Sequence, residues 1–255
     1  MTLLYSALGI LLVCLLGWWW QVRTHNATHA DVIWAGCVGA ASLYYLLCGN
    51  GAWAPRLGAG LLIFAWSGRL AWHISKRLLG QPEDGRYQAM RAHYGDRINR
   101  FHLVFFLGQG VLAWLFALPA WVLASYPPSV NTATLIAGLI LGGLALLGES
   151  VADRQLARFR DDRANRGITC RQGWWRYSRH PNYFFEWLHW LAWPILAWGI
   201  PFGGWVWLAP LVMYMFVRFG SGVPYTELQA LKSRGENYRH YQQTTSAFFP
   251  WRPGS

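Results

Sequence analysis

Long unbroken apolar blocks are the feature that most constrains the fold of this chain. The blocks lie near residues 3–20, 32–48, 53–73, 101–122, 131–149, 182–200 and 204–220. Each is close to the ~20 residues that an α-helix needs to cross the hydrocarbon core of a bilayer. The composition agrees, because 54% of the residues are hydrophobic and only 13% are charged. We therefore predict an all-α, polytopic membrane protein with about seven transmembrane helices.

The first block is expected to remain in the mature protein as a span. Arg23 follows this block rather than preceding it, which is the wrong polarity for a cleaved signal peptide. No internal repeat and no long linker divides the chain. We therefore predict one domain over residues 1–255, with a substrate side at about 1–125 and a cofactor side at about 131–255.

The distribution of basic residues predicts the orientation in the membrane. Two connections, at about 76–100 and 154–179, carry most of the Lys and Arg, whereas those around 125–130 and 200–204 carry no charge. Connections rich in Lys and Arg stay on the cytoplasmic side. This places the amino terminus outside and the carboxyl terminus in the cytoplasm, and we expect the protein to lie in a bacterial cytoplasmic membrane.

Neither nucleic acid nor a metal ion is an expected partner. The formal net charge is +11, but the basic residues lie between apolar blocks and not on a nucleic-acid-binding motif. The four cysteines show no Cys-x-x-Cys spacing, which argues against zinc and a disulfide framework. The pairs His25/His29 and Glu186/His189 have metal-ligand spacing, but they lack the further ligands that a metal site needs.

An arginine-rich loop that runs into a tryptophan-rich helix at about 173–190 predicts an anion site. Pro181 suits the first position of a helix, where its missing N–H is of no consequence. The free N–H groups of the first helical turn attract anions. We expect Arg171, Arg176, Arg179 and His180 to reinforce this site.

Glu186 is a functional candidate inside this helix. It lies four residues after Asn182, so the two side chains share a face. A carboxylate one turn inside an apolar helix is costly unless it has a partner. The alternative is an interfacial glutamate that extends toward water, with the nearby arginines holding lipid headgroups.

A second stripe of polar residues lies at the end of the fifth block. Glu149, Asp153 and Arg160 recur at helical spacing on one face. Carboxylates suit ribose hydroxyls and arginine suits phosphate, so the stripe is a candidate for the adenosine half of a dinucleotide. The alternative is an exposed helix with ordinary ion pairs. No Gly-x-Gly-x-x-Gly motif follows a strand, so a Rossmann fold is not expected.

Ionisable residues in the first three blocks are candidates for the substrate side. Arg69 and His73 share a helical face with Trp66, and Arg69 lies deep enough to need a partner or a wet cavity. Asp31 at the start of the second block is its natural counter-charge. A pocket-lining role and a purely structural ion pair remain open.

Several of these residues belong to motifs of a known family. The motifs are Asp31-x-x-Trp34, Trp66-x-x-Arg69-Leu70, Gly80 with Glu83-Asp84-x-Arg86-Tyr87, Ser178-Arg-His-Pro-Asn-Tyr183, and Ser221-Gly222-x-Pro224 to Ser246-Ala-Phe-x-Pro-Trp251. In this combination, the chain resembles the bacterial DUF1295 membrane proteins, which are relatives of the steroid 5-alpha-reductase family.

The resemblance implies a seven-helix fold that binds NADPH among the carboxyl-terminal helices and transfers hydride to an enone lipid. By matching position, it implies that the cofactor is contacted by Glu149, Asp153, Arg160, Asn182, Glu186 and Arg218. Tyr183 belongs to the same motif as Asn182, and we predict that it also binds the cofactor, together with Arg171, Arg179 and His180 of the anion site. The steroid reductases hold the 3-keto oxygen with a Gln-Glu pair and a tyrosine, whereas this chain lacks the pair and carries Trp66 at the tyrosine position.

We therefore expect a membrane-embedded NADPH-dependent reductase of a conjugated C=C bond in a steroid-, sterol- or prenyl-like lipid that enters from the bilayer. The candidates for the group that polarises the carbonyl are Asp31, Trp34, Tyr44, Arg69 and His73. The alternatives are a lipid or isoprenylcysteine-type methyltransferase that uses S-adenosylmethionine, and a lipid-binding protein without activity. The arginines at about 154–179 favour the dinucleotide, because S-adenosylmethionine carries no phosphate.

Overall fold

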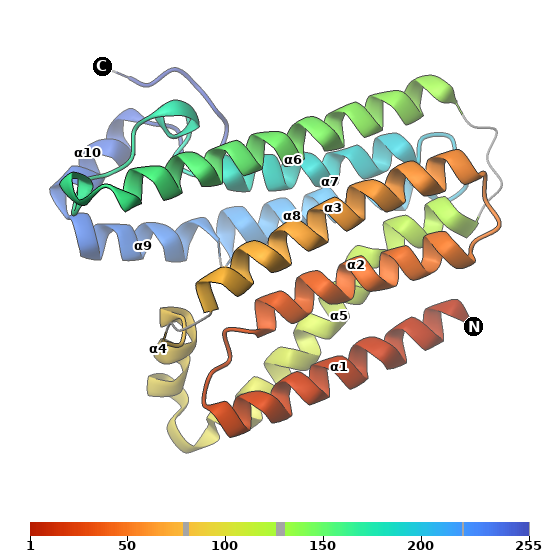
Figure 1. Cartoon of the computed structure of the whole chain (residues 1–255), viewed down its shortest axis with the longest axis horizontal. Coiled ribbons are helices and arrows are strands. Elements are labelled where there is room, and N and C mark those ends of the chain that lie inside the picture. Colours follow the sequence, from red (N-terminus) through yellow and green to blue (C-terminus); the bar gives the residue numbers. More distant parts are fainter. Residues whose placement is uncertain (79–81, 126–130, 221, 255) are drawn as a thin grey trace. The chain divides into compact units, whose positions relative to one another are not determined.

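The computed structural model describes residues 1–78, 82–125, 131–220 and 222–254, and within these residues it contains helices and no β-strand. This confirms the all-α prediction. Gly80, Ser221 and the connection at 126–130, which the sequence analysis singled out, lie outside the described residues. The α-helices labelled in Figure 1 are α1 (Thr2–Thr24), α2 (Ala30–Cys48), α3 (Trp53–Leu78), α4 (Gly85–Tyr94), α5 (Ile98–Ser125), α6 (Thr132–Asp161), α7 (Pro181–Leu196), α8 (Leu208–Phe219), α9 (Val223–Arg234) and α10 (Glu236–Thr244).

Five helical segments among the described residues are long and apolar enough to cross a membrane. They are Thr2–Thr24, Ala30–Cys48, Gly85–Ser125, Thr132–Asp161 and Gly203–Arg234. The chain is therefore a polytopic integral membrane protein. The count of seven spans and the placement of the amino terminus outside stay predictions.

Two predicted spans near the carboxyl end differ from the observed helices. The span predicted at 182–200 starts with Pro181 at the first helical position, as expected, but α7 ends at Leu196. Gly199 then turns the chain with a φ of 78°, a conformation that favours glycine. The span predicted at 204–220 begins with a 3-10 turn at Gly203–Trp207 and becomes α-helical only at Leu208. Sequence hydrophobicity predicted the apolar stretches but not these breaks.

The chain divides into two compact units. The first comprises Met1–Asn131 with Gly199–Gly203, and the second comprises Thr132–Trp198 with Gly204–Ser255. The predicted substrate side falls in the first unit, and nearly all of the predicted cofactor side falls in the second. The description of the whole chain as one domain stays a prediction.

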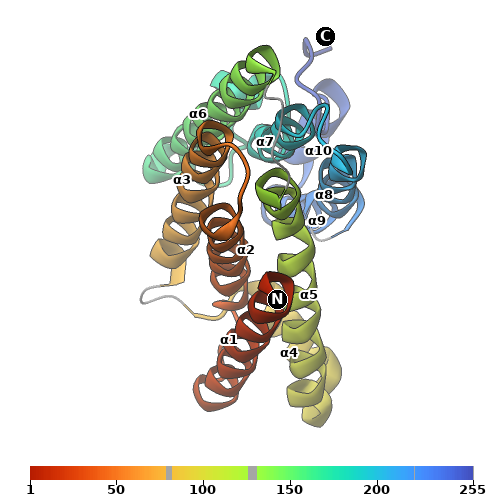
Figure 2. The ribbon, with the colours of Figure 1, turned by 90° about the vertical axis from the view of Figure 1, so that its right-hand side faces the viewer.

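In the first unit, α1, α2 and α5 pack together, and α3 lies against α2 (Figure 2). Small residues allow this close approach. A Cβ added at Gly110 of α5 would lie 2.9 Å from the Cys14 Sγ of α1, and one at Gly39 of α2 would overlap Ser67 of α3. Packing over small residues is the usual way in which membrane helices associate, since lipid provides no hydrophobic drive between them.

In the second unit, α6 and α7 run antiparallel along each other (Figure 1). A Cβ at Gly138 would meet Leu196 at 2.7 Å, and one at Gly148 would overlap the Phe185 ring, so early α6 faces late α7 and late α6 faces early α7. The helices α9 and α10 pack on each other around the buried Tyr241. These two pairs of helices position the residues of the candidate site.

Candidate functional site

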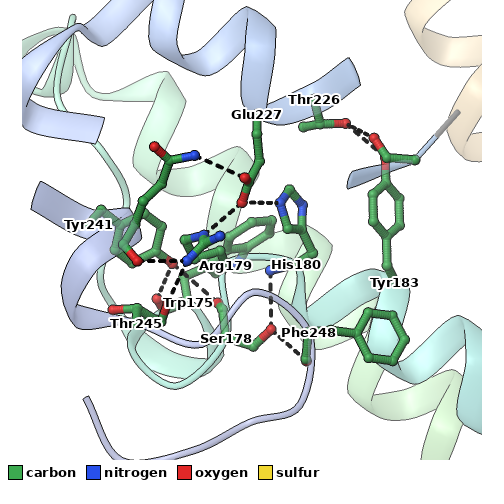
Figure 3. A network of polar contacts seen from close by, with 12 residues as sticks. Trp175, Ser178, Arg179, His180, Tyr183, Thr226, Glu227, Tyr241, Thr245 and Phe248 are labelled. Atoms are coloured by element: carbon green, nitrogen blue, oxygen red, sulfur yellow. Dashed lines mark hydrogen bonds and ion pairs between the residues drawn. The ribbon is translucent and has the colours of Figure 1, made fainter. Parts of the chain in front are cut away.

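The turn before α7 lies within a network of polar contacts (Figure 3). Ser178 is fully buried, and its hydroxyl accepts a hydrogen bond from the His180 N–H at 3.1 Å. The same hydroxyl donates to the Phe248 carbonyl at 2.8 Å. The turn is therefore fixed before Pro181 starts the helix.

Glu227 of α9 receives contacts from three side chains (Figure 3). Its Oε1 accepts from Arg179 Nε at 2.7 Å and lies 3.3 Å from His180 Nε2. Its Oε2 accepts from Gln242 Nε2 at 2.9 Å. The side chains of Arg179 and Glu227 expose only 11% and 16% of their surface, so their ion pair is largely buried. Sequence reasoning missed Glu227, because it lies 48 residues beyond Arg179 in the chain.

Arg179 makes further contacts with the carboxyl-terminal segment. Its Nη1 donates to the carbonyls of Gln242 at 2.9 Å and Thr245 at 2.6 Å. Its backbone N–H donates to the Ser246 carbonyl at 2.8 Å. We predicted Arg179 as an anion ligand, and the structure gives this side chain partners within the protein.

The last part of the chain, residues 246–251, is called the C-terminal strap here because it runs along the loop before α7. The Trp251 N–H donates to the Tyr177 carbonyl at 2.9 Å. From α10, the Tyr241 hydroxyl donates to the Trp175 carbonyl, and its oxygen lies 3.1 Å from the Ser178 carbonyl oxygen. The strap and α10 together hold the loop in place.

Aromatic packing anchors the strap to the helices. Phe248 is buried, and its ring centroid lies 6.0 Å from that of Phe184, 5.9 Å from that of Trp187 and 5.2 Å from that of Tyr214. Trp251, by contrast, is 75% exposed. The strap therefore has one buried aromatic residue, Phe248, and one exposed aromatic residue, Trp251.

The antiparallel pair α6 and α7 brings acidic and amide side chains together. Asn182 Nδ2 donates to Asp153 Oδ1 at 3.3 Å. Glu149 lies one turn before Asp153 on α6, and Glu186 lies one turn after Asn182 on α7. The antiparallel course therefore sets Glu149 level with Glu186. Both glutamates are buried, and Glu186 Oε1 accepts from the Trp190 indole N–H at 2.9 Å.

The described residues contain no group of three or more His, Cys, Asp or Glu side chains that could hold a metal ion. The carboxylate and amide oxygens on α6 and α7 can accept hydrogen bonds from the hydroxyl groups of an organic ligand.

Tyr183 and Arg171 contact other parts of the second unit. The Tyr183 ring stacks on the His180 ring at a centroid distance of 5.4 Å, and its hydroxyl lies 3.1 Å from that of Thr226. Arg171 Nη2 donates to the Asn237 carbonyl at 3.0 Å. Both side chains therefore join the loop and α7 to the helices of the carboxyl-terminal segment.

The last two predicted cofactor residues are arginines at helix ends. Arg160 is exposed near the end of α6, where it is accessible to a ligand in water. Arg218 is half-buried in the last turn of α8, with its guanidinium 5.1 Å from the Phe219 ring centroid. All ten predicted cofactor residues lie in the second unit.

Burial sets the protonation of His180 and Tyr241, which lie outside the five candidate spans. It lowers the pKa of His180 below the ordinary value of 6.5, although the Glu227 carboxylate acts in the opposite direction. The imidazole is therefore neutral at pH 7. Burial also raises the pKa of Tyr241, so its hydroxyl keeps the proton that it donates.

The predicted catalytic residues lie in the first unit. Asp31 accepts from Arg86 Nη2 at 2.6 Å and from the Tyr87 hydroxyl at 3.1 Å. Both partners belong to the first turn of α4, which Asp84 caps by accepting from the Arg86 N–H at 2.9 Å. We considered Asp31 as the counter-charge of Arg69, and the structure shows an ion pair with Arg86. Sequence reasoning did not find this pair, because α4 must fold back onto the start of α2.

The other substrate-side candidates are spread along α2 and α3. Tyr44, Arg69 and His73 are all half-buried. Trp34 packs edge-on against Trp66, with ring centroids 5.7 Å apart. That these side chains line a cavity next to the cofactor stays a prediction.

The fold and the site define this chain as a polytopic helical membrane protein with a buried polar network in its second unit. Residues 17–245 match the model of DUF1295, which is described as a protein of unknown function. The match covers most of the sequence, so the chain belongs to the DUF1295 family, as its motifs predicted. No curated protein matches the sequence.

Proposed function

We propose that this protein is a membrane-embedded NADPH-dependent reductase, which reduces a C=C bond conjugated to a carbonyl in a hydrophobic lipid. The observation that carries the proposal is the grouping of three carboxylates and one amide on α6 and α7. Asn182 contacts Asp153, and the buried Glu149 and Glu186 lie level with each other. Acidic side chains in apolar helices are costly, and their usual reason is function.

The chemistry of this donor set fits a dinucleotide. Carboxylate and amide oxygens accept hydrogen bonds from ribose hydroxyls. Arg160 and Arg176 are exposed in the same unit, and guanidinium groups are well suited to bind phosphate groups. The 2′-phosphate of NADPH needs positive partners, so we expect NADPH to bind more tightly than NADH. When bound, the reduced nicotinamide supplies the hydride.

The proposal assigns the substrate to the first unit. Asp31, Tyr44, Arg69 and His73 are the candidates for the group that polarises the carbonyl, with Tyr87 and Arg86 holding the Asp31 carboxylate. A steroid-, sterol- or prenyl-like lipid would reach these helices from the bilayer. We expect the protein to lie in a bacterial cytoplasmic membrane.

A methyltransferase that uses S-adenosylmethionine is the second candidate. The same observation favours it, because carboxylates attract a sulfonium cation and also accept from its ribose hydroxyls. The Arg-His-Pro-x-Tyr motif at 179–183 occurs in isoprenylcysteine methyltransferases as well. The arginines around the end of α6 favour the dinucleotide, since S-adenosylmethionine has no phosphate.

Calorimetric titration of the purified protein in detergent with NADPH, NADH and S-adenosylmethionine tests the proposal. NADPH should bind most tightly, and Asp153→Ala should weaken its binding. Glu236→Ala is the matched control, because the Glu236 side chain is 84% exposed in a surface ion pair. Equal affinity for NADPH and NADH, or binding of S-adenosylmethionine alone, would contradict the reductase.

A further inference from the structure

We propose that Glu227 is a positioning residue of the cofactor site and that Arg179 and His180 hold the turn before α7 through it, without touching the ligand. The inference rests on the proposed function, which makes Asn182 and Glu186 the ligand-binding residues of α7. It changes the role that the sequence predicts for the Arg179–His180 pair from anion binding to positioning.

Three of the five N–H donors of Arg179, on Nε and Nη1, are directed at the protein. A guanidinium has five N–H donors, and an arginine that binds phosphate presents them as an open fork. Here Nε donates to Glu227, and Nη1 donates to two backbone carbonyls at 2.9 and 2.6 Å. The side chain exposes only 11% of its surface. A ligand phosphate would have to displace these contacts.

The His180 side chain is likewise directed at the protein. Only 2% of the residue is exposed. Its ring stacks on Tyr183, and its Nε2 lies 3.3 Å from the Glu227 carboxylate. A neutral, enclosed imidazole adds no positive charge to an anion site.

Glu227 therefore fixes the two residues that come directly before α7. The next residues are Pro181, which starts the helix, and Asn182, whose side chain contacts Asp153. A displaced turn would rotate or shift the first turn of α7, and with it the Asn182 amide. Small displacements of this kind lower ligand affinity strongly, because binding depends on pre-organised geometry.

The alternative is that Glu227 only stabilises the fold. A buried ion pair is a weak source of net stability, since the desolvation of both charges offsets their attraction. Removing one partner is nevertheless harmful, so stability and positioning must be measured separately.

A double-mutant cycle on NADPH affinity provides the test. Glu227→Gln and Arg179→Met should each raise the Kd for NADPH by about 10- to 100-fold, as found for groups that orient metal ligands. The Kd of the double variant for NADPH should be no higher than that of the weaker-binding single variant, because both substitutions remove the same ion pair that positions the turn. Losses that multiply in the double variant would show that Arg179 contacts the ligand itself and would overturn the proposal.

Glu83→Gln is the matched control for stability. Glu83 forms a comparably buried ion pair with Arg91 at 2.8 Å, but in the first unit. This variant should lower the melting temperature and leave the Kd for NADPH unchanged. If Glu83→Gln raises the Kd as much as Glu227→Gln does, Glu227 acts only through stability. If Glu227→Gln does not fold, Gln242→Met is the replacement variant, because it removes only one of the three side-chain contacts of Glu227. Its Kd for NADPH should exceed that of the wild type, but by less than the roughly 10-fold increase expected for Glu227→Gln.

Hydrogen exchange separates this inference from the proposed function. Wild-type protein that binds no NADPH would contradict the reductase, yet the positioning role would still be measurable without ligand. In Glu227→Gln the amides of residues 182–186 should exchange faster than in wild type and in Glu83→Gln. Unchanged exchange in this segment would overturn the positioning role even where the wild type binds NADPH.

Discussion

Replacement of Glu186 by glutamine should weaken NADPH binding while leaving the fold intact. In the structure, Glu186 Oε1 accepts from the fully buried Trp190 indole at 2.9 Å. Glutamine keeps an oxygen for this indole and has nearly the same volume, so the unfolding free energy should change by less than about 1 kcal/mol. Alanine would leave the indole N–H without this acceptor, which costs about 1–3 kcal/mol.

The effect on binding follows from the lost charge. A hydrogen bond from a ribose hydroxyl to a carboxylate contributes about 1.5–3 kcal/mol, whereas one to a neutral amide contributes about 0.5–1.5 kcal/mol. The difference of roughly 1.4 kcal/mol corresponds to about a tenfold higher Kd.

The assay is calorimetric titration with NADPH, combined with thermal unfolding followed by tryptophan fluorescence. Trp190→Phe is the control, because it removes the indole donor and keeps the Glu186 carboxylate. This variant should melt at a lower temperature with little change in Kd. If Glu186→Gln binds NADPH with wild-type affinity, the reasoning is refuted. The Glu186 carboxylate would then serve the structure of the protein and not ligand binding.

Three further predictions follow from other parts of the chain. Asp31→Asn should preserve NADPH affinity but lower kcat, because its carboxylate lies on the substrate side; an increased Kd with unchanged kcat would contradict this. Gly148→Ala should destabilise the protein by about 1–3 kcal/mol, because the new Cβ would overlap Phe185, whereas Gly143→Ala on the same helix meets nothing within 4 Å and should be tolerated; similar melting temperatures for both variants would refute this. The unfolding free energy should fall as the pH drops below about 6.5, since the unfolded chain binds a proton at His180 before the folded chain does; an equally steep fall in His180→Gln would contradict the assignment.

The helices were predictable because their signals are local. Blocks of apolar residues predicted the long helices, and Pro181 marked the first residue of α7. The early end of α7 depends on a turn with Gly199 at positive φ, and hydrophobicity carries no information about it. The same holds for α8, which starts only after the 3-10 turn at Gly203–Trp207.

The acidic stripe on α6 and the Asn182/Glu186 pair were predictable from helical spacing. The structure adds how they meet, since Asn182 contacts Asp153 where the end of α6 lies against the start of α7. The role of Glu227 was not predictable, because three contacts converge on it from segments that are distant in sequence. For the same reason the sequence did not indicate that Arg86 pairs with Asp31.

Transfer of deuterium from labelled NADPH to a lipid tests the central claim most directly. The purified protein would be placed in lipid nanodiscs with a bacterial lipid extract and NADPH that carries deuterium at C4 of the nicotinamide. Mass spectrometry should then find a lipid product that has gained one deuterium and one proton, at a rate that Asp153→Ala lowers. Without deuterium in any lipid, or with a methyl group transferred from labelled S-adenosylmethionine in its place, the reductase account would be contradicted.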